Sequence, residues 1–209
     1  MLIKGGHMKI LIIGDVHGYF QPFQQLIDRY ADKVDLVIQL GDLIDRGPST
    51  KDVLDLAIKL EQEDKYIFLK GNHEFELLLH HESGMNEHWH NQMGKQTLEQ
   101  LSDNYEEYIN WLNHRPLKYE TDGILVTHAG IANIETDYWD EDNEHGILWN
   151  RLPLKRLNKF QIHGHTPTHS GDVEINQQSN SCNIDTGMGL GNKLSGIIIE
   201  DDKIIEIIS

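Results

Sequence analysis

The sequence has almost no cysteine and no long hydrophobic run. Cys182 is the one cysteine among 209 residues, so an intramolecular disulfide is excluded. We interpret Cys182 as a small buried hydrophobe and expect a reducing compartment. No apolar run approaches the roughly 20 residues of a membrane-spanning helix. The opening MLIKGGHM lacks the apolar segment of a secretory signal. We therefore expect a cytoplasmic protein with no membrane partner.

Positive charge is also scarce. The chain has 18 Lys and Arg residues against 34 Asp and Glu residues, which gives a formal net charge of -16. Such a field repels the nucleic-acid backbone and anionic lipid surfaces, so neither is an expected partner. An anionic substrate would have to be attracted by a local positive centre.

Length and composition favour one globular domain. The 209 residues suffice for one sizeable core, and 38% of them are hydrophobic. We expect a single domain over residues 8–209 and a monomer. The GGHM segment is typical of a cloning remnant, so residues 1–7 are left out of the functional interpretation.

Short β-branched runs alternate with helical patterns. The alternation predicts an α/β architecture with some parallel pairing. Buried strands are predicted at 9–13, 35–40, 66–70, 124–128 and 160–164, and helices at 22–31, 50–62, 74–81 and 98–112. The tail runs at 181–187, 195–200 and 203–209 predict a second, more antiparallel sheet packed on the first, with a hairpin turn at Asp201-Asp202.

A polar loop follows each of the five strands. The loops read GDVHG, GDLIDRG, GNHE, HAG and HGHTP in chain order. Open α/β sheets bind ligands at the carboxyl ends of their strands, so we expect the loops to converge on one crevice.

These loops offer a set of metal ligands. Carboxylate oxygen together with imidazole nitrogen suits Mn, Fe or Zn better than Ca or Mg. The set is larger than one tetrahedral ion needs, and two ions ~3.5–4 Å apart that share a bridging carboxylate would use all of it. Such a centre is net positive and could hold a phosphate. The candidate ligands are Asp15, His17, Asp42, Asn72, His128 and His165.

The loop GDLIDRG adds two further groups. Arg46 could direct its guanidinium toward phosphate oxygens, a geometry that Lys cannot match. Asp45 would serve neither metal nor phosphate. Its natural partner is a histidine, whose protonated form the carboxylate would stabilise.

Taken together, the motifs resemble the phosphoprotein phosphatase family of calcineurin-like metallophosphoesterases. The similarity runs from Asp15 to about Asn192 and is greatest to the bacteriophage lambda-type and bacterial Ser/Thr phosphatases. It implies a four-layer αββα fold, in which two packed mixed β-sheets are flanked by helices. It also implies two divalent ions, Mn²⁺ first, with Fe or Zn as alternatives. Asp15, His17 and Asp42 would hold one ion, and Asp42, Asn72, His128 and His165 the other.

The resemblance also implies roles for residues beside the metals. His73 of GNHE would be the general acid, paired with Asp45. Arg46 and Arg151, the latter in LWNR, would clamp the phosphate, and Asn72 would contribute to substrate binding. The stretch DTGMGLGN at 185–192 matches the family segment that borders the site.

The function implied by this resemblance is hydrolysis of a phosphomonoester by direct attack of a metal-bound hydroxide. The first expectation is a Ser/Thr-type protein phosphatase acting on phosphoprotein. The alternative is a symmetrical bis(5'-nucleosyl)-tetraphosphatase, a sister branch that tends to have GDLVARG, GNHD and a longer chain. Here Asp45 replaces Ala and Glu74 replaces Asp, which favours the first expectation. A catalytically silent binding module would have lost ligands, and the sequence has lost none.

Other histidines and tryptophans receive simpler interpretations. The resemblance selects His165 rather than His163 from HGH. Residues 80–91 hold four of the 13 histidines and are expected to form a solvated loop, with an accessory metal site as the alternative. Trp89 and Trp139 are expected to serve ordinary packing, although either could border the cleft.

Overall fold

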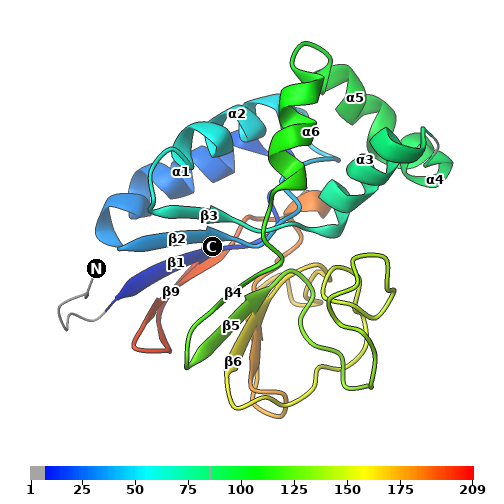
Figure 1. Ribbon diagram of the computed structural model, residues 1–209. Coiled ribbons are helices and arrows are strands. Elements are labelled where there is room, and N and C mark those ends of the chain that lie inside the picture. Colours follow the sequence, from blue (N-terminus) through cyan, green and yellow to red (C-terminus); the bar gives the residue numbers. More distant parts are fainter. Residues whose placement is uncertain (1–7, 85) are drawn as a thin grey trace.

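Two mixed five-stranded sheets form the centre of the molecule (Figure 1). The computed structural model describes residues 8–84 and 86–209, so the expected cloning remnant 1–7 lies outside the described residues. The first sheet has the order β10-β9-β1-β2-β3 and the second β4-β5-β6-β8-β7. The strands are β1 Lys9–Ile13, β2 Leu36–Gln39, β3 Tyr66–Phe68, β4 Lys118–Glu120, β5 Ile124–Thr127, β6 Phe160–His163, β7 Glu174–Asn176, β8 Ser181–Asn183, β9 Gly196–Glu200 and β10 Lys203–Ile208.

Each sheet combines parallel and antiparallel pairs. In the first sheet β1 runs parallel to β2, and β2 parallel to β3, while β9 and β10 are antiparallel to their neighbours. In the second sheet β5, β6 and β8 are parallel, and β4 and β7 run antiparallel at the edges. The parallel strands are nearly continuous apolar runs because both of their faces are covered.

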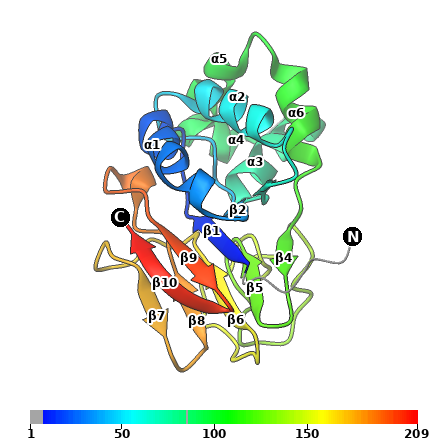
Figure 2. The ribbon, with the colours of Figure 1, turned by 90° about the vertical axis from the view of Figure 1, so that its left-hand side faces the viewer.

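The core between the sheets is aliphatic. Ile12 and Ile38 of the first sheet and Val126 and Ile162 of the second belong to one buried cluster. Figure 2 shows the two sheets seen from the side of the β9–β10 hairpin. Cys182 lies in this cluster with no exposed surface, and burial raises the pKa of its thiol to about 12. The prediction of a small buried hydrophobe is therefore confirmed.

Helices cover the other face of the first sheet (Figure 1). In α1, Phe23, Leu26, Ile27 and Tyr30 are buried and follow the spacing of one helix face. The helices are α1 Phe20–Tyr30, α2 Thr50–Leu60, α3 Asn72–Ser83, α4 Glu87–Trp89, α5 Lys95–Leu101 and α6 Tyr105–Asn113, with a π-helical turn η2 at His90–Gly94 and 3₁₀ turns η1 at Ala31–Lys33 and η3 at Met188–Leu190.

The expected pair of mixed sheets flanked by helices is confirmed, but the helices lie on one side. Over the outer face of the second sheet, the described chain carries no α-helix between residues 114 and 187. There Leu125 packs against Ile131 and Ile147 of the long connection between β5 and β6. This connection takes the place of the outer helical layer that the four-layer expectation contained.

Three expectations about the elements are corrected or confirmed. The tail does not build the second sheet by itself, because β8 joins β6 whereas β9 and β10 extend the first sheet. The hairpin at Asp201-Asp202 is confirmed, and both residues have positive φ. The helical pattern at 98–112 is two helices, interrupted at residues 102–104 by Ser, Asp and Asn, whose side chains compete for backbone hydrogen bonds.

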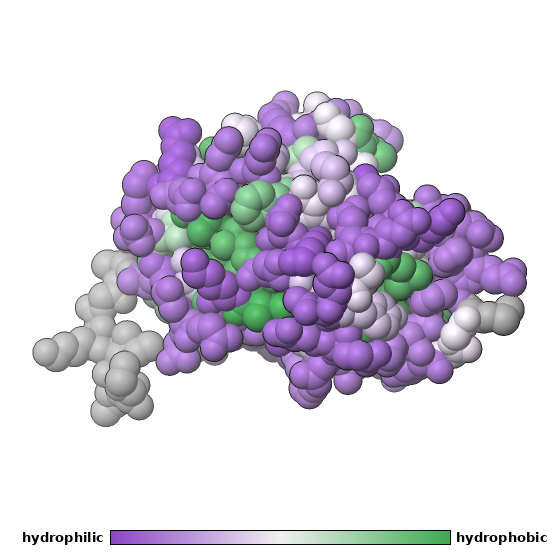
Figure 3. Space-filling model, turned by 90° about the horizontal axis from the view of Figure 1, so that it is seen from above, coloured by the Kyte–Doolittle hydropathy of each residue, from purple (hydrophilic) through white to green (hydrophobic). Residues whose placement is uncertain are grey.

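The helical side of the surface is mostly polar. Seen from above, hydrophilic side chains cover most of this face, and hydrophobic ones show only in small patches (Figure 3). Among the described helices, none has the length and apolar character needed to cross a membrane.

The inter-sheet core makes a prediction about Cys182. Cys182→Ser should lower the free energy of unfolding by ~1–3 kcal/mol, because the new hydroxyl would be buried without a hydrogen-bond partner. Cys182→Ala introduces no polar group and serves as the control. Chemical denaturation measures both, and a Ser variant no less stable than the Ala variant would contradict the assignment.

Candidate active site

The polar loops meet at one place, with Asp42 at its centre. Asp42 forms one group with His17 and His73, and a second with His128 and His165. In each group the potential ligand atoms lie within 4.8 Å of one another. Asp42 is thus the shared member, and its bridging role stays a prediction. Asp15, predicted as a ligand, belongs to neither group, whereas His73, predicted as the general acid, belongs to the first.

The two carboxylate oxygens of Asp42 face different histidines. Oδ2 lies 3.6 Å from His17 Nε2, and Oδ1 lies 3.5 Å from His128 Nε2. Oδ1 also accepts a hydrogen bond from the backbone N–H of His73 at 3.1 Å. Although burial raises the pKa of Asp42, the histidines around it, His128 above all, hold that pKa well below its usual value.

Asn72 lies beside the second group. Its Oδ1 lies 3.0 Å from His128 Nε2 and 2.8 Å from His165 Nδ1. Asn72 is the first residue of α3, directly after the loop that follows β3. Oxygen and nitrogen ligand atoms from three separate elements therefore point to one position.

Asp15 is buried beside other carboxylates. Its Oδ2 accepts a hydrogen bond from the His165 backbone N–H at 3.1 Å, but its Oδ1 has no partner. Oδ2 of Asp185 is likewise buried without a partner. Burial raises the pKa of Asp15, and the carboxylates of Asp185 and Asp42 raise it further. Unpartnered oxygens among like charges are the surroundings that a cation would stabilise.

The imidazoles are in the form that binds metal. Burial lowers the pKa of His17 to about 3, and it also lowers the pKa values of His128 and His165. Neutral imidazole has a free nitrogen lone pair at pH 7. The donor set of buried carboxylates, an amide oxygen and neutral imidazoles therefore fits divalent metal ions of the Mn, Fe or Zn type. These residues could hold such ions.

His73 lies between Asp45 and Arg46. Its Nδ1 is 2.6 Å from Asp45 Oδ2, and its Nε2 is 3.3 Å from Arg46 Nη2. Although burial lowers the pKa of His73, Asp42 and then Asp45 outweigh it and raise that pKa above the usual value. The structure thus brings together three of the residues to which the sequence assigned catalytic roles.

Arg151 lies at the rim. Its side chain is exposed, and Nη1 donates to Thr166 Oγ1 at 3.1 Å. Its positive charge contributes to the lowered pKa of His165, for which burial is the largest cause. The phosphate-clamping role of Arg151 stays a prediction.

Glu74 is a residue whose role the sequence did not reveal. It has no exposed surface, and its carboxylate accepts the backbone N–H groups of Gly71, Asp42 and Leu43, each at 2.8 Å. Burial, followed by the charge of Asp42, raises its pKa to about 7. Glu74 therefore ties the start of α3 to the loop after β2. The only signal in the sequence was an acidic residue in the first turn of the helix.

The backbone of the site is strained. Eight described residues other than Gly have positive φ, and five of them are predicted site residues. Each such residue costs about 1–3 kcal/mol and persists only where its surroundings enforce it, which is common at functional sites. The five are His17, Asp42, Asp45, Arg46 and His165.

The histidine-rich segment is more ordered than expected. Trp89 is 2% exposed and its indole Nε1 donates to Asp45 Oδ2 at 2.7 Å, so its role is not packing alone. The described residues 80–84 and 86–91 include the end of α3, all of α4 and the start of η2 rather than an irregular loop alone. Among the described residues they form no group of three potential metal ligands. His163, half-buried at the end of β6, belongs to neither Asp42 group.

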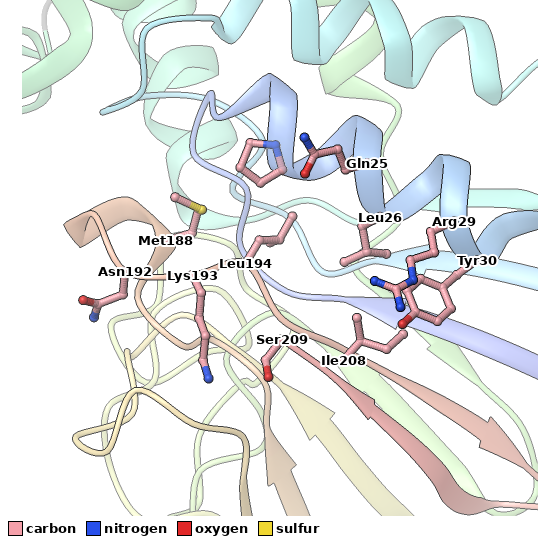
Figure 4. A pocket seen from close by; sticks show the side chains of 11 residues that line it. Gln25, Leu26, Arg29, Tyr30, Met188, Asn192, Lys193, Leu194, Ile208 and Ser209 are labelled. Carbon is pink, nitrogen blue, oxygen red and sulfur yellow. The ribbon is translucent and has the colours of Figure 1, made fainter.

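A separate pocket is lined by other residues. It has a volume of about 350 Å³ and is formed by α1, the segment after β8 and the end of β10 (Figure 4). Leu26, Arg29, Tyr30 and Lys193 contribute to its wall, and none of the predicted site residues does.

The chain is similar in sequence and fold to known phosphoesterases and phosphatases. The family model described as calcineurin-like phosphoesterase matches residues 8–187. Serine/threonine-protein phosphatase 2 of Escherichia coli (strain K12) is 30% identical over 204 residues, which are 89% of this chain and 90% of that protein. A symmetrical bis(5'-nucleosyl)-tetraphosphatase of Hamiltonella defensa is 30% identical over 182 residues, 80% of this chain but 63% of that protein. A solved cold-active protein tyrosine phosphatase superposes with a TM-score of 0.68 at 17% identity, covering 95% of this chain and 75% of that one, and supports the fold alone.

The shared position of Asp42 predicts metal content. Asp42→Asn should lose more bound metal than Asp15→Asn, because a bridging ligand serves both ions and a terminal ligand serves one. Elemental analysis after loading with Mn²⁺ measures the metal per chain, with the exposed Asp103→Asn as control. Equal metal content in the Asp42 and Asp15 variants would show that Asp42 does not bridge.

The contacts of Glu74 predict a positioning effect. Glu74→Gln places an amide N–H₂ against backbone N–H groups, so Mn²⁺ affinity should fall by ~10–100-fold, as when outer partners of metal ligands are removed. Titration calorimetry of the metal-free variant measures this. Glu82→Gln, at an exposed position of the same helix, should bind Mn²⁺ like the unchanged protein. If Glu74→Gln binds Mn²⁺ as tightly as the unchanged protein, Glu74 does not influence the metal site.

Proposed function

The chain belongs to the calcineurin-like phosphoesterase family, and from this premise we propose that it is a phosphomonoesterase of the Ser/Thr protein phosphatase type. Phosphoester hydrolysis follows from the family. The preference for a phosphoprotein is our inference and depends mainly on one observation. That observation is the 2.6 Å contact between His73 Nδ1 and the buried carboxylate of Asp45.

The contact matters because of the leaving group. A serine or threonine alkoxide is a strong base and needs a proton as the ester bond breaks, which a positioned acid supplies at ~10²–10⁴-fold in rate. In the hydrolysis of diadenosine tetraphosphate, the leaving group is a nucleotide that departs through a phosphate oxygen. This oxygen is a much weaker base and has little need for that proton. A buried Asp45 that favours the protonated form of His73 is therefore suited to alkoxide departure.

The chain's own residues then have separate tasks. Arg46 and Arg151 would bind the phosphoryl oxygens, and Asn72 would help to orient them. With the Arg46 guanidinium turned from His73 Nε2 to the phosphoryl oxygens, His73 would hold a proton on Nε2 and deliver it to the departing oxygen, while its Nδ1–H remains bonded to Asp45. Two divalent ions, proposed to be Mn²⁺, would be held by the six ligands and would supply positive charge and an activated water.

Diadenosine tetraphosphate hydrolysis is the second candidate. Several similar proteins are named symmetrical bis(5'-nucleosyl)-tetraphosphatase, including the Hamiltonella defensa protein described above. Asp45 argues against it, since that branch tends to have Ala there. The acidic composition supports a protein that binds neither nucleic acid nor membranes, and we propose a cytoplasmic monomer.

Three substrates decide between the candidates. Steady-state rates on a phosphoserine peptide, p-nitrophenyl phosphate and diadenosine tetraphosphate should be compared at the same Mn²⁺ concentration. We expect the highest kcat/KM for the phosphopeptide. A higher value for diadenosine tetraphosphate would reverse the assignment.

The acid role of His73 predicts different effects on two substrates. His73→Asn should slow hydrolysis of the phosphoserine peptide by ~10²–10⁴-fold but that of p-nitrophenyl phosphate by clearly less, because nitrophenolate leaves without a proton. Arg46→Ala should slow both by similar factors, since both share the phosphoryl group. Metal content must be checked in each variant because His73 adjoins Asn72. Equal losses on both substrates for His73→Asn, with metals retained, would exclude the acid role.

A further inference from the structure

Asp45 is a fully buried carboxylate that receives hydrogen bonds from three side chains. Oδ2 accepts from the Trp89 indole at 2.7 Å and lies 2.6 Å from His73 Nδ1, while Oδ1 accepts from the Thr97 hydroxyl. Asp45 has no exposed surface, so water does not compete for these oxygens. A carboxylate removed from water is stable only when such donors replace its hydration, and donors to a charged acceptor bond strongly.

Two of the donors come from a distant part of the chain. Trp89 is the last residue of α4 and Thr97 lies in α5, which are 44 and 52 residues beyond Asp45. The two helices lie in the helical layer next to α3 (Figure 1). The loop after β2 therefore depends on this helical segment for the surroundings of Asp45.

The indole is itself fixed on several sides. The Trp89 backbone N–H donates to Asn86 Oδ1 at 3.3 Å, and the ring lies 5.3 Å from that of His80. A Cβ on Gly94 would come within 2.5 Å of the Trp89 ring, so a side chain there would displace the indole. Gly94 closes the π-helical turn η2, an irregularity that is frequent at functional sites.

These contacts leave the Asp45 carboxylate one orientation. Because Thr97 engages Oδ1 and Trp89 engages Oδ2, rotation about the side chain would break both bonds. The position of Asp45 at φ +70° also shows that the local chain alone does not favour this placement. The remaining acceptor direction of Oδ2 is the one that meets His73.

We propose that Trp89 and Thr97 are positioning residues that hold the Asp45 carboxylate against His73 Nδ1 and thereby keep Nε2 directed at the leaving group. This inference rests on the phosphomonoesterase function proposed above. Their bonds run to Asp45, so both would act through Asp45 and His73 on proton delivery rather than on substrate binding. A purely structural role would change stability without changing how the rate depends on the leaving group.

The test uses aryl phosphates whose leaving phenols span a range of pKa values, together with a phosphoserine peptide. Trp89→Phe removes the N–H donor and keeps most of the ring, and Thr97→Val removes the hydroxyl and keeps the shape. Each should lower kcat for the poorest leaving groups by roughly 3–30-fold. This is a part of the ~10²–10⁴-fold rate enhancement that a general acid supplies. Each should leave kcat for p-nitrophenyl phosphate within about twofold, with KM unchanged.

Trp111→Phe is the matched control. The Trp111 indole of α6 also donates to a carboxylate, Glu61 Oε2 at 2.6 Å, but Glu61 directly follows α2 and is not one of the site residues. This variant should lose stability without a change in leaving-group dependence. In an Asp45→Ala background, Trp89→Phe should have no further effect on kcat, because the carboxylate it positions is gone.

Each outcome bears on the proposal. Uniform slowing of all substrates, or no change in either variant with metals retained, would overturn it, as would full additivity with Asp45→Ala. If Trp89→Phe fails to fold, Thr97→Val decides alone.

The aryl series separates this inference from the protein phosphatase assignment. An enzyme that cleaves aryl phosphates but not phosphopeptides refutes that assignment. The slope of rate against leaving-group pKa still tests Trp89 and Thr97 in that case.

Discussion

The backbone and side chain of Asp42 connect the parts of the site, and the rest depends on that connection. Its carbonyl accepts the N–H of His17 at 2.8 Å, its N–H donates to Glu74, and its carboxylate accepts the N–H of His73. The loops after β1, β2 and β3 are therefore joined through one residue. Because Asp42 lies at positive φ and is buried, this arrangement persists only while all three partners are in place.

The two sheets explain why these loops can meet at all. β1, β2 and β3 are parallel neighbours in one sheet, and β5 and β6 are parallel neighbours in the other. The aliphatic core between the sheets holds their carboxyl ends at the same edge, so His128 and His165 reach the side of Asp42 opposite His17. Packing between sheets thus sets the distance between the two ligand groups.

The sequence predicted the local elements and the meeting of their polar loops, and what it missed were particular tertiary contacts. Strands and their polar loops could be identified because apolar runs and turn residues lie next to each other in the chain. The partition of the tail between two sheets could not, since strand pairing joins distant segments. The same holds for Glu74 and Trp89, which act through hydrogen bonds to residues about 30 and 44 positions away. Nothing in GNHE or EHW indicates which backbone or carboxylate those side chains will meet.

The contacts that the sequence did not reveal share one electrostatic role, which is to compensate buried carboxylates. Asp42, Asp45 and Glu74 are carboxylates without appreciable exposure in a protein of net charge -16, so each needs compensation other than water. Glu74 obtains it from backbone N–H groups, and Asp45 from Trp89, Thr97 and His73. Asp15 and Asp185 keep one oxygen each without a donor. The supporting carboxylates Glu74 and Asp45 are thus hydrogen bonded within the protein at both oxygens, whereas Asp15 and Asp185 keep an unpartnered oxygen close to the charge of Asp42, where a cation would bind.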